Sequence, residues 1–544
     1  VADYSYKIGN NDQLNVEYRQ NGLDLFGTFQ YRLQHLKETG ETVQMTDVDT
    51  LWKQRTHSTD LGKNISYFGQ FGFNYEINKN HSFGATYELT SAPRDKMSND
   101  NRTEVYADHE LYDVWNTNAF SIEKTYPTHH SNFYYHGDIN SLEIDLNADV
   151  LVGKNKEEEN IKELSLNYDD LSMTTFSETS NKLYAGKLVL AYPLFKGRIS
   201  GGSEYSYIHR ISDFSGFGNQ ILGTSDKIRE RNLAFFLNCT WSLGGIDASA
   251  GLRYEDVKSD FYENSIYQSD ESKHYRNLFP SLSLKGSVGK VHWGLGYHIQ
   301  VARPYYEQLK NEIHYGNRFT YLGGTPNLQP TYIHTAEMRA AYRDLQLSVG
   351  YNRYNDDILF SIEQATSDPK ITLIKFRNVE HRDEMTASLV YSPGIGCWRP
   401  EWVASVQSQW FNIGYLDGTK NMNGITVGIR WNNSFQLPMG YIFRLNGTYT
   451  GKGVYQNSFT RPVSCFGVSI YKSFFNGRLD CTVEGNDLFH TVRDATTQYD
   501  NKVKIYRETQ RNTQEVKLTV HYKFNLQKSK YKGTGAGLDE QQRL

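Results

Sequence analysis

The feature that most constrains this chain is a strict alternation of apolar and polar residues. From Ile246 to Tyr254 every second residue is apolar or aromatic, and the residues between them are polar or glycine. The same period of two recurs in 142–150, 291–299 and 425–431. Because successive side chains of a β-strand point to opposite faces, this period predicts strands with one apolar and one polar face. A soluble sandwich and a membrane barrel both fit this pattern.

Strand length and loop asymmetry favour the membrane barrel. The expected strands are about 9 to 15 residues long, enough to cross a bilayer when tilted, whereas soluble strands average about 5 or 6. The connections alternate between tight turns and long polar loops, as at the two ends of an outer-membrane barrel. The tight turns are expected at 20–22, 78–80, 244–245, 289–290, 343–344, 436–439 and 475–477. The long loops are expected at 34–63, 91–129, 152–180, 212–227, 260–273, 304–330 and 489–511.

Tracing the chain from a periplasmic start gives about 22 strands, the first at 2–8 and the last at 512–525. An even number of strands places both termini in the periplasm. This count treats 370–392 as one strand and 162–169 as loop. A different assignment of either segment changes the number of strands by about two, so roughly 20 or 24 strands are the alternatives. We therefore expect an all-β, transmembrane, antiparallel up-and-down barrel over residues 1–525. Residues 526–544 are polar and glycine-rich, which predicts a flexible periplasmic C-terminal tail.

The composition agrees with a barrel. Only 38% of the residues are hydrophobic, although 40 of the 544 are tyrosine, whereas soluble proteins draw roughly 45–50% from the apolar set. No window approaches the roughly 18 consecutive apolar residues of a transmembrane helix. A barrel strand needs an apolar residue only at every second position, which explains how a chain this polar can lie in a bilayer.

The charge, the cysteines and the motif content exclude other classes. The formal net charge is −4, without the basic excess of a nucleic-acid-binding protein, so no nucleic acid partner is expected. The four cysteines have no metal-ligand spacing, and Cys239 is predicted to be a small outward-facing apolar residue. The sequence has no hydrolase, metalloprotease or nucleotide-loop motif. We expect no enzyme activity, no metal site and no cofactor.

A barrel of this size raises the question of what fills its lumen. Barrels near 22 strands are typically plugged, whereas barrels of 16 to 18 strands form open porins. No plug-sized segment precedes the first expected strand, and the internal loops are too short to seal the lumen. The chain is therefore expected to be the barrel part of a plugged transporter, and the strand count argues against a passive porin.

Two segments and two shorter motifs carry a family resemblance. Residues 302–309 read ARPYYEQL and residues 323–330 read GGTPNLQP. Together they resemble the "RP…L…GNPNLKPE" signature of TonB-dependent receptors, and 14–27 and 485–489 are similar to that family's early hairpin and penultimate-strand motif. The sequence departs from the signature at Thr325, Gln329 and Thr331. It also contains neither the plug domain nor the TonB box of that family.

The resemblance implies a bacterial outer-membrane receptor that takes up a ligand bound at its outer face. Its implied partners are the lipid bilayer, lipopolysaccharide and, if the full protein has a plug with a TonB box, the TonB complex. The alternative is a plug-less barrel that serves as a scaffold or subunit of an outer-membrane complex, with a surface lipoprotein as a possible partner. Siderophore, cobalamin, glycan and peptide receptors share such barrels, so the ligand is not identified.

A ligand site is expected where the long extracellular loops converge on the plug. Aromatic and cationic loop residues are the candidates because they combine a large contact area with a polar tip; packing of the loops on one another is the alternative. The candidates are Trp52, Trp115, Tyr305, Tyr306, Tyr315, Arg318 and Tyr321. A structural role in stiffening the loop before the strand at 331–343 is expected for Pro326, Asn327, Leu328 and Pro330.

Overall fold

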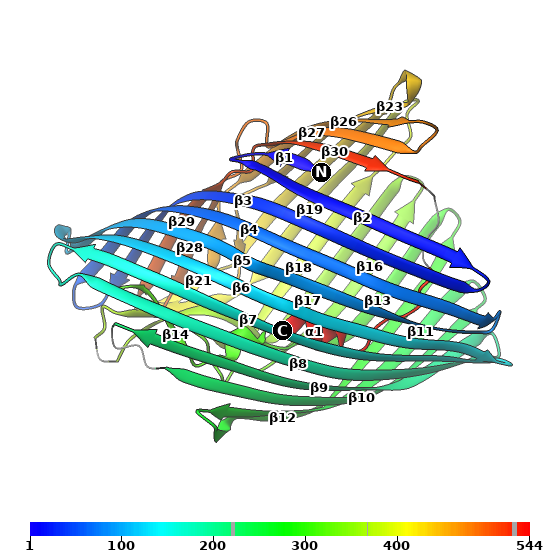
Figure 1. The fold of residues 1–544 in the computed structure, drawn as a ribbon, viewed down its shortest axis with the longest axis horizontal. Helices are drawn as coiled ribbons and strands as arrows, with labels where there is room; N and C mark the ends of the chain where they lie inside the picture. The colour runs from blue at the N-terminus through cyan, green and yellow to red at the C-terminus, as the bar shows by residue number, and fades with distance from the viewer. Residues whose placement is uncertain (219–222, 367, 525–529) are drawn as a thin grey trace.

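The computed structural model describes residues 1–218, 223–366, 368–524 and 530–544. Within these residues the chain forms a closed antiparallel barrel of 22 strands with a strong tilt (Figure 1). The predicted fold class and strand number are therefore confirmed. Positions 219–222 of the expected loop 212–227, and 526–529 of the expected tail, lie outside the described residues.

The 22 barrel strands run through the chain in order, with shorter elements between some of them. The barrel strands are β1 (Ala2–Tyr4), β2 (Ile8–Gln20), β3 (Leu23–Asp47), β4 (Leu51–Asn78), β5 (His81–Ala107), β6 (Glu110–Ile139), β7 (Leu142–Ser165), β8 (Leu171–Leu194), β9 (Gly197–Phe217), β10 (Thr224–Leu243), β11 (Ile246–Glu263), β12 (Ile266–Val288), β13 (Val291–Ala302), β16 (Thr331–Tyr342), β17 (Leu345–Gln364), β18 (Thr372–Tyr391), β19 (Trp398–Trp410), β22 (Gly424–Gln436), β23 (Tyr441–Thr450), β26 (Val463–Phe474), β27 (Leu479–Asn486) and β30 (Glu515–Tyr522).

The remaining elements lie in the connections and at the C-terminal end. They are η1 (Tyr306–Leu309), β14 (Ile313–Asn317), β15 (Thr320–Gly323), β20 (Asn412–Tyr415), β21 (Gly418–Asn421), η2 (Pro438–Gly440), β24 (Gly453–Tyr455), β25 (Ser458–Thr460), β28 (Asp494–Asp500), β29 (Val503–Arg511) and α1 (Leu538–Arg543). None of the helices in the described parts of the chain is both long and apolar enough to cross a membrane.

One end of the barrel, here called the short-turn rim, consists of tight hairpins. In the first of them Asn21 and Gly22 have φ values of 50° and 81°, the left-handed geometry that two-residue hairpins require. Gly244 and Gly245 form a second such turn, with φ values of 57° and 95°. The opposite end, the loop rim, also has two-residue turns, at Asp108–His109 and Asn264–Ser265, and carries longer connections mainly after β13. The predicted asymmetry between the two rims is therefore present chiefly in the C-terminal half of the barrel.

Most of the expected long loops are wrong as loops, because the strands continue through them. β3 has 25 residues and β6 has 30, so the regions 34–63 and 91–129 are largely β-hairpin. Residues 162–165, expected to be loop, belong to β7, whereas β18 confirms a single strand within 370–392. Beyond the apolar belt both faces of a strand are polar, so the alternation disappears although the backbone ladder continues.

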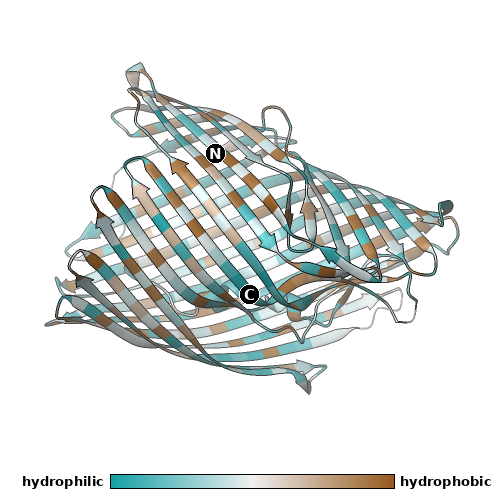
Figure 2. Cartoon of the chain, turned by 180° about the vertical axis from the view of Figure 1, so that it is seen from behind, coloured by the Kyte–Doolittle hydropathy of each residue, from teal (hydrophilic) through white to brown (hydrophobic). Residues whose placement is uncertain are grey.

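The two faces of the barrel wall have inverted polarity. On β10 the outward positions include Leu237 and Cys239, as the sequence predicted, while Glu230 and Asn232 point inward and are buried. Figure 2 shows the same alternation as successive hydrophobic and hydrophilic bands along the strands. An apolar outside and a polar inside match a barrel in a lipid bilayer.

Segments at the loop rim connect distant parts of the wall. β15 pairs in parallel with β18, with Tyr321 opposite Leu373. β29 pairs with β3 over nine residues, with Val503 opposite Thr46. The side chain of Gln44 on β3 also donates a hydrogen bond of 3.1 Å to Thr372 on β18. The mouth of the barrel is therefore bridged by its own loops.

Both ends of the chain lie within the barrel. The amino group of Val1 donates to the carbonyl of Asn11 at 2.8 Å, and β1 closes the wall between β2 and β30. Residues 530–544 enter the lumen, where Ala536 is fully buried (Figure 1). The sequence predicted a flexible tail here and did not indicate this packing against the wall; the periplasmic position of the two termini stays a prediction. The glycines of this segment fit closely against the wall, so glycine content here does not signal mobility.

Candidate ligand site at the loop rim

The hairpin β14–β15 crosses the mouth from β18 to the wall of β7. Its Tyr315 hydroxyl donates a hydrogen bond of 2.9 Å to Glu163, a fully buried carboxylate on β7. Thr117 on β6 donates to the same carboxylate at 2.9 Å. Burial and the charge of Glu163 hold the pKa of Tyr315 well above its usual range, so the phenol stays a hydrogen-bond donor.

An aromatic group, here called the mouth cluster, packs around Phe319 at the tip of this hairpin. The rings of Trp52 and Trp115 lie edge-on to Phe319, with centroids 5.3 and 5.0 Å away. Tyr112 lies edge-on to Trp52 at 5.1 Å. Edge-to-face contacts of this kind are favourable because the positive ring edge meets the negative ring face. The mouth cluster therefore joins the hairpin to β4, β5 and β6.

Asp113 orients Trp115 from the tip of β6. Its carboxylate accepts from the Trp115 indole at 2.6 Å, from the Ser165 hydroxyl at 2.7 Å and from the Leu166 amide at 2.9 Å. Burial alone would raise the pKa of Asp113, but these hydrogen bonds outweigh it and lower the pKa. Trp115 is consequently locked in place and fully buried.

Arg318 supplies the positive charge of the hairpin. Its guanidinium forms an ion pair of 2.7 Å with Glu163 and donates to the carbonyl of Asp169 at 2.5 Å. It also stacks over the ring of Tyr168 at 5.1 Å. Burial and the hydrogen bond with Tyr112 raise the pKa of Tyr168 to about 12. Arg318 therefore fastens the hairpin to the connection between β7 and β8.

The structure brings five of the seven candidate residues together and separates the other two. Tyr321 packs edge-on to Tyr315 at 5.6 Å, beside Arg318. Tyr305, in contrast, is 57% exposed on the loop before η1. Tyr306 is fully buried deeper in the lumen, where its hydroxyl donates to Glu230 at 3.0 Å. The five residues brought together are Trp52, Trp115, Tyr315, Arg318 and Tyr321.

The motif at 323–330 packs the loop onto the wall. The amide of Gln329 donates to Asn378 at 2.8 Å, and Asn378 donates back to the Gln329 carbonyl at 2.9 Å. Leu328 is buried between Pro326 and Pro330, in the same core as Leu309. These contacts hold the loop against the wall; a structural role of the motif, as opposed to ligand contact, stays a prediction.

Asn327 behaves differently from the expectation that its side chain bonds its own backbone. It is exposed, and its side-chain oxygen accepts a hydrogen bond from the ammonium of Lys273 on β12.

Charged side chains of the inner wall pair with one another. Arg382 is buried and binds Asp357 at 2.7 Å and Glu384 at 2.9 Å. Arg253 binds Glu255 at 2.6 Å and Glu204 at 3.2 Å. Buried charges are tolerated only when they are paired and hydrogen-bonded, so these groups define a wall that is polar and whose charges already have partners.

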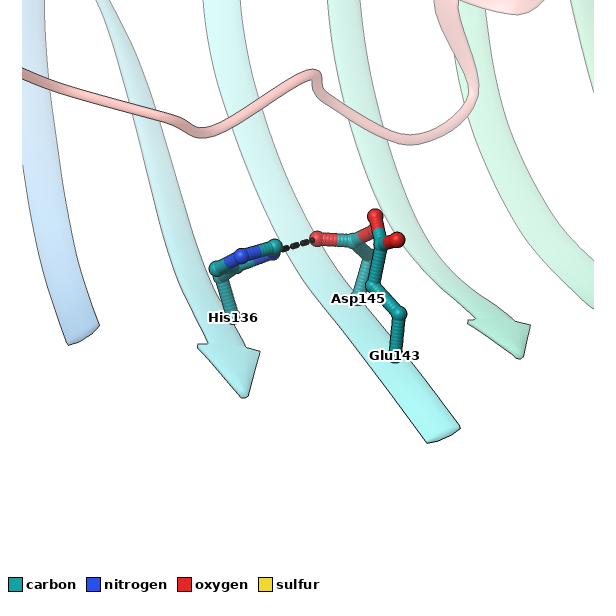
Figure 3. Close-up of side chains that lie close together, drawn as sticks. All are labelled: His136, Glu143 and Asp145. Atoms are coloured by element: carbon teal, nitrogen blue, oxygen red, sulfur yellow. Dashed lines mark hydrogen bonds and ion pairs between the residues drawn. The ribbon is translucent and has the colours of Figure 1, made fainter. Parts of the chain in front are cut away.

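Among the described residues, one group of three potential metal ligands lies on the inner wall near the short-turn rim (Figure 3). His136 on β6 lies opposite Asp145 on β7 in the strand register, with their side chains 2.6 Å apart. Glu143 belongs to the group but is paired with Arg198 on β9 at 2.6 Å. A guanidinium already balances the charge of Glu143, so the group is an ion-pair network of the wall.

Sequence reasoning did not identify the anchor of the hairpin. Glu163 fell in a segment expected to be loop, and Phe319 was not singled out although it follows Arg318 directly. The signal available in the sequence was the alternation of Glu163 and Ser165 with Leu164 and Leu166, which indicates a continued strand. In the structure Glu163 is buried on the inner face and Leu164 is exposed on the outer face.

The fold and these sites define an outer-membrane barrel protein: a large antiparallel barrel with an apolar outside, a charged inside and loops folded over one rim. A profile of the outer membrane protein beta-barrel family matches residues 138–522, more than half of the chain, and the protein belongs to this family.

Solved structures show the same fold at low sequence identity. The outer membrane transporter YddB from Escherichia coli is similar with a TM-score of 0.53 and 10% identity, covering 90% of this chain and 76% of YddB. The copper transporter OprC is similar with a TM-score of 0.51 and 10% identity, covering 88% of this chain and 80% of OprC. A search of curated proteins found no match. The predicted resemblance is confirmed as membership of an outer-membrane β-barrel family and as a shared barrel fold.

Proposed function

We propose that this chain is the barrel of a TonB-dependent outer-membrane transporter that takes up a ligand bound at the loop rim. The observation that carries the proposal is a closed 22-strand barrel whose mouth is bridged by loops rich in aromatic and cationic residues. Supporting it, the solved structures of this fold include transporters. The charged side chains of the inner wall, which are of types that can act in catalysis, are engaged in ion pairs with one another. This pairing favours transport over catalysis.

In this proposal the short-turn rim faces the periplasm and the loop rim faces the exterior, surrounded by lipopolysaccharide. This orientation follows the general rule that outer-membrane barrels have short periplasmic turns and long outer loops. Energy coupling would require a plug with a TonB box elsewhere in the full protein. The paired charges of the inner wall would then be the surface on which the plug packs.

The proposed ligand surface is the outer side of the hairpin β14–β15 and the loop before η1. Tyr305 offers an exposed ring on the loop before η1, and Arg318 and Tyr321 lie half-buried on the hairpin β14–β15. Trp52 and Trp115 support this surface from below, because the mouth cluster holds the hairpin in position. A ligand that moves the hairpin would therefore act on the contact between Tyr315 and Glu163.

Uptake assays in the native bacterium test this proposal. A strain lacking the gene and its parent are given labelled ferric siderophore, cobalamin, oligosaccharide or peptide. We expect the uptake of one of these classes to depend on the gene and to stop when an uncoupler collapses the proton gradient. Gene-dependent entry of small solutes of all kinds, insensitive to the uncoupler, would show a passive pore. Unchanged uptake of every class would favour a scaffold.

A further inference from the structure

Side chains on the inner wall of strands β3–β10 accept hydrogen bonds from the backbone of the C-terminal segment, residues 530–544. Four consecutive amide groups of the segment point at the wall, and each finds an acceptor there. The acceptors are Asn147 for Thr534 and Gly535 (3.0 and 3.2 Å), Asp149 for Ala536 (2.7 Å) and Glu204 for Gly537 (3.0 Å). Buried carboxylate and amide oxygens are costly without donors, so this stretch of wall is chemically complementary to the backbone of a peptide.

The glycines of the segment are required by this fit. Gly535 and Gly537 have φ values of 76° and 63°, in the left-handed region. A Cβ atom on Gly537 would lie 2.8 Å from that of Ala185 on β8. A Cβ atom on Gly533 would lie 2.5 Å from the side-chain oxygen of Asn132 on β6. The glycine spacing therefore matches the contour of the wall.

The segment ends in a buried ion pair deep in the lumen. The guanidinium of Arg543 donates to both oxygens of Glu230, at 2.5 and 3.3 Å, and stacks on the ring of Tyr306 at 4.3 Å. Its Nε atom donates to the carbonyl of Pro304 at 3.0 Å. Bidentate pairs between arginine and carboxylate are the strongest of the charged hydrogen bonds. Arg543 thereby binds the wall and the loop 303–330 at once.

The same segment is fastened near the short-turn rim. The amide of Lys530 donates to Asp24 at 2.7 Å, and its ammonium lies 3.1 Å from Glu76. The ring of Tyr531 lies edge-on to Tyr134 at 4.8 Å. Figure 3 shows the segment passing along the inner wall above His136 and Asp145. It therefore spans from the short-turn rim to the loop that descends from the mouth.

We propose that residues 530–544 are a strap: the wall of β3–β10 is a binding site for this glycine-rich peptide, and the bound strap holds the loop 303–330 in the lumen. Ala536 of the strap shares one apolar core with Leu309 and Leu328 of that loop. The strap is a physical connection between the short-turn rim and the loop that carries Tyr305 and Tyr306. This inference does not depend on which ligand is transported.

Thiol labelling of the purified full-length protein in detergent tests the docking. In a background with the four native cysteines replaced by alanine, Ala536→Cys and Leu538→Cys are labelled with a maleimide. Leu538 is 46% exposed and Ala536 is 0% exposed, so these neighbours are matched probes. We expect Leu538→Cys to react at least about tenfold faster, the ratio for a 1.4 kcal/mol difference in local opening. Equal fast rates at both positions would overturn the proposal.

Hydrogen exchange then tests the effect on the loop. Arg543→Glu should lower the protection of the amides in 304–309 and 325–329, whereas Gln542→Glu, an exposed neighbour, should not. The charge swap Glu230→Arg with Arg543→Glu should restore protection. Loop protection that is the same in Arg543→Glu and in the unaltered protein would overturn the strap. Folding of each variant is checked by SDS gel electrophoresis, in which a folded barrel that resists SDS does not migrate as the unfolded chain.

Discussion

The hydroxyl of Tyr315 and the carboxylate of Glu163 are joined by a hydrogen bond of 2.9 Å across 152 positions of sequence. This contact ties the hairpin that crosses the mouth to the wall of β7. Glu163 also holds Arg318 at 2.7 Å, so a single buried carboxylate anchors two of the proposed ligand-site residues. These contacts help to hold the loops that bridge the mouth in place.

Two variants that remove part or all of this anchor should loosen the hairpin to different extents. Tyr315→Phe removes one hydrogen bond to a charged group and should cost about 1–3 kcal/mol, or roughly 5- to 150-fold in local opening. Glu163→Ala also leaves Arg318 without its partner and should cost about 3–5 kcal/mol. Hydrogen exchange over 313–323 measures both effects. Tyr321→Phe, which keeps the ring packed on Tyr315, is the matched control; an equal loss there would contradict the assignment.

The docking of the same hairpin should weaken at alkaline pH through His314. Its imidazole lies 3.3 Å from Glu312 and also faces Lys310 and Glu159. Burial alone would lower the pKa of His314, but the hydrogen bond and charge of Glu312 outweigh burial and raise it.

Because the pKa is higher when the hairpin is docked, protonation of His314 favours docking. This stabilisation is fully present below the ordinary histidine pKa of about 6.5 and is lost as the pH rises through the folded pKa. We expect protection of 313–323, corrected for intrinsic exchange, to be greater at pH 6 than at pH 8.5. His314→Asn should show no such difference; a variant with unchanged pH dependence would refute the role of His314.

The buried charge triad of the wall should be sensitive to loss of its arginine. Arg382→Met leaves Asp357 and Glu384 buried without a counter-charge, which should cost about 3–5 kcal/mol. Arg339→Met removes an exposed pair with Glu337, 2.8 Å apart, and should cost less than about 1 kcal/mol. Urea unfolding in lipid vesicles measures both free energies. A similar loss of unfolding free energy in the two variants would mean that water solvates the charges around Arg382, and it would contradict the prediction.

A charged residue placed near the middle of the outer face should destabilise the barrel. Leu295 is exposed on the outside of β13, whereas His298 three positions later points into the lumen. Leu295→Arg should destabilise the folded barrel by about 2–4 kcal/mol, because arginine is costly near the bilayer midplane. His298→Arg is the matched control and should be tolerated. Equal stability of the two variants in lipid vesicles would contradict the assignment of the faces.

The sequence by itself determined the wall of this protein. The period of two set which face of β11 and β13 is apolar, and the Asn21–Gly22 turn set the register of β2 with β3. These properties depend on residues near one another in the chain, so local patterns suffice to predict them.

Only the tertiary structure decided what fills the barrel. Residues 34–63 and 91–129 lost the alternation and were predicted as loops, because outside the bilayer both faces of a strand are polar while the backbone ladder persists. The contacts of Glu163 with Tyr315, and of Glu230 with Arg543, join residues 152 and 313 positions apart. The close fit of Gly533 and Gly537 depends on Asn132 and Ala185, which lie on distant strands of the wall. Closure of the barrel brings these groups together, and local sequence cannot specify such contacts.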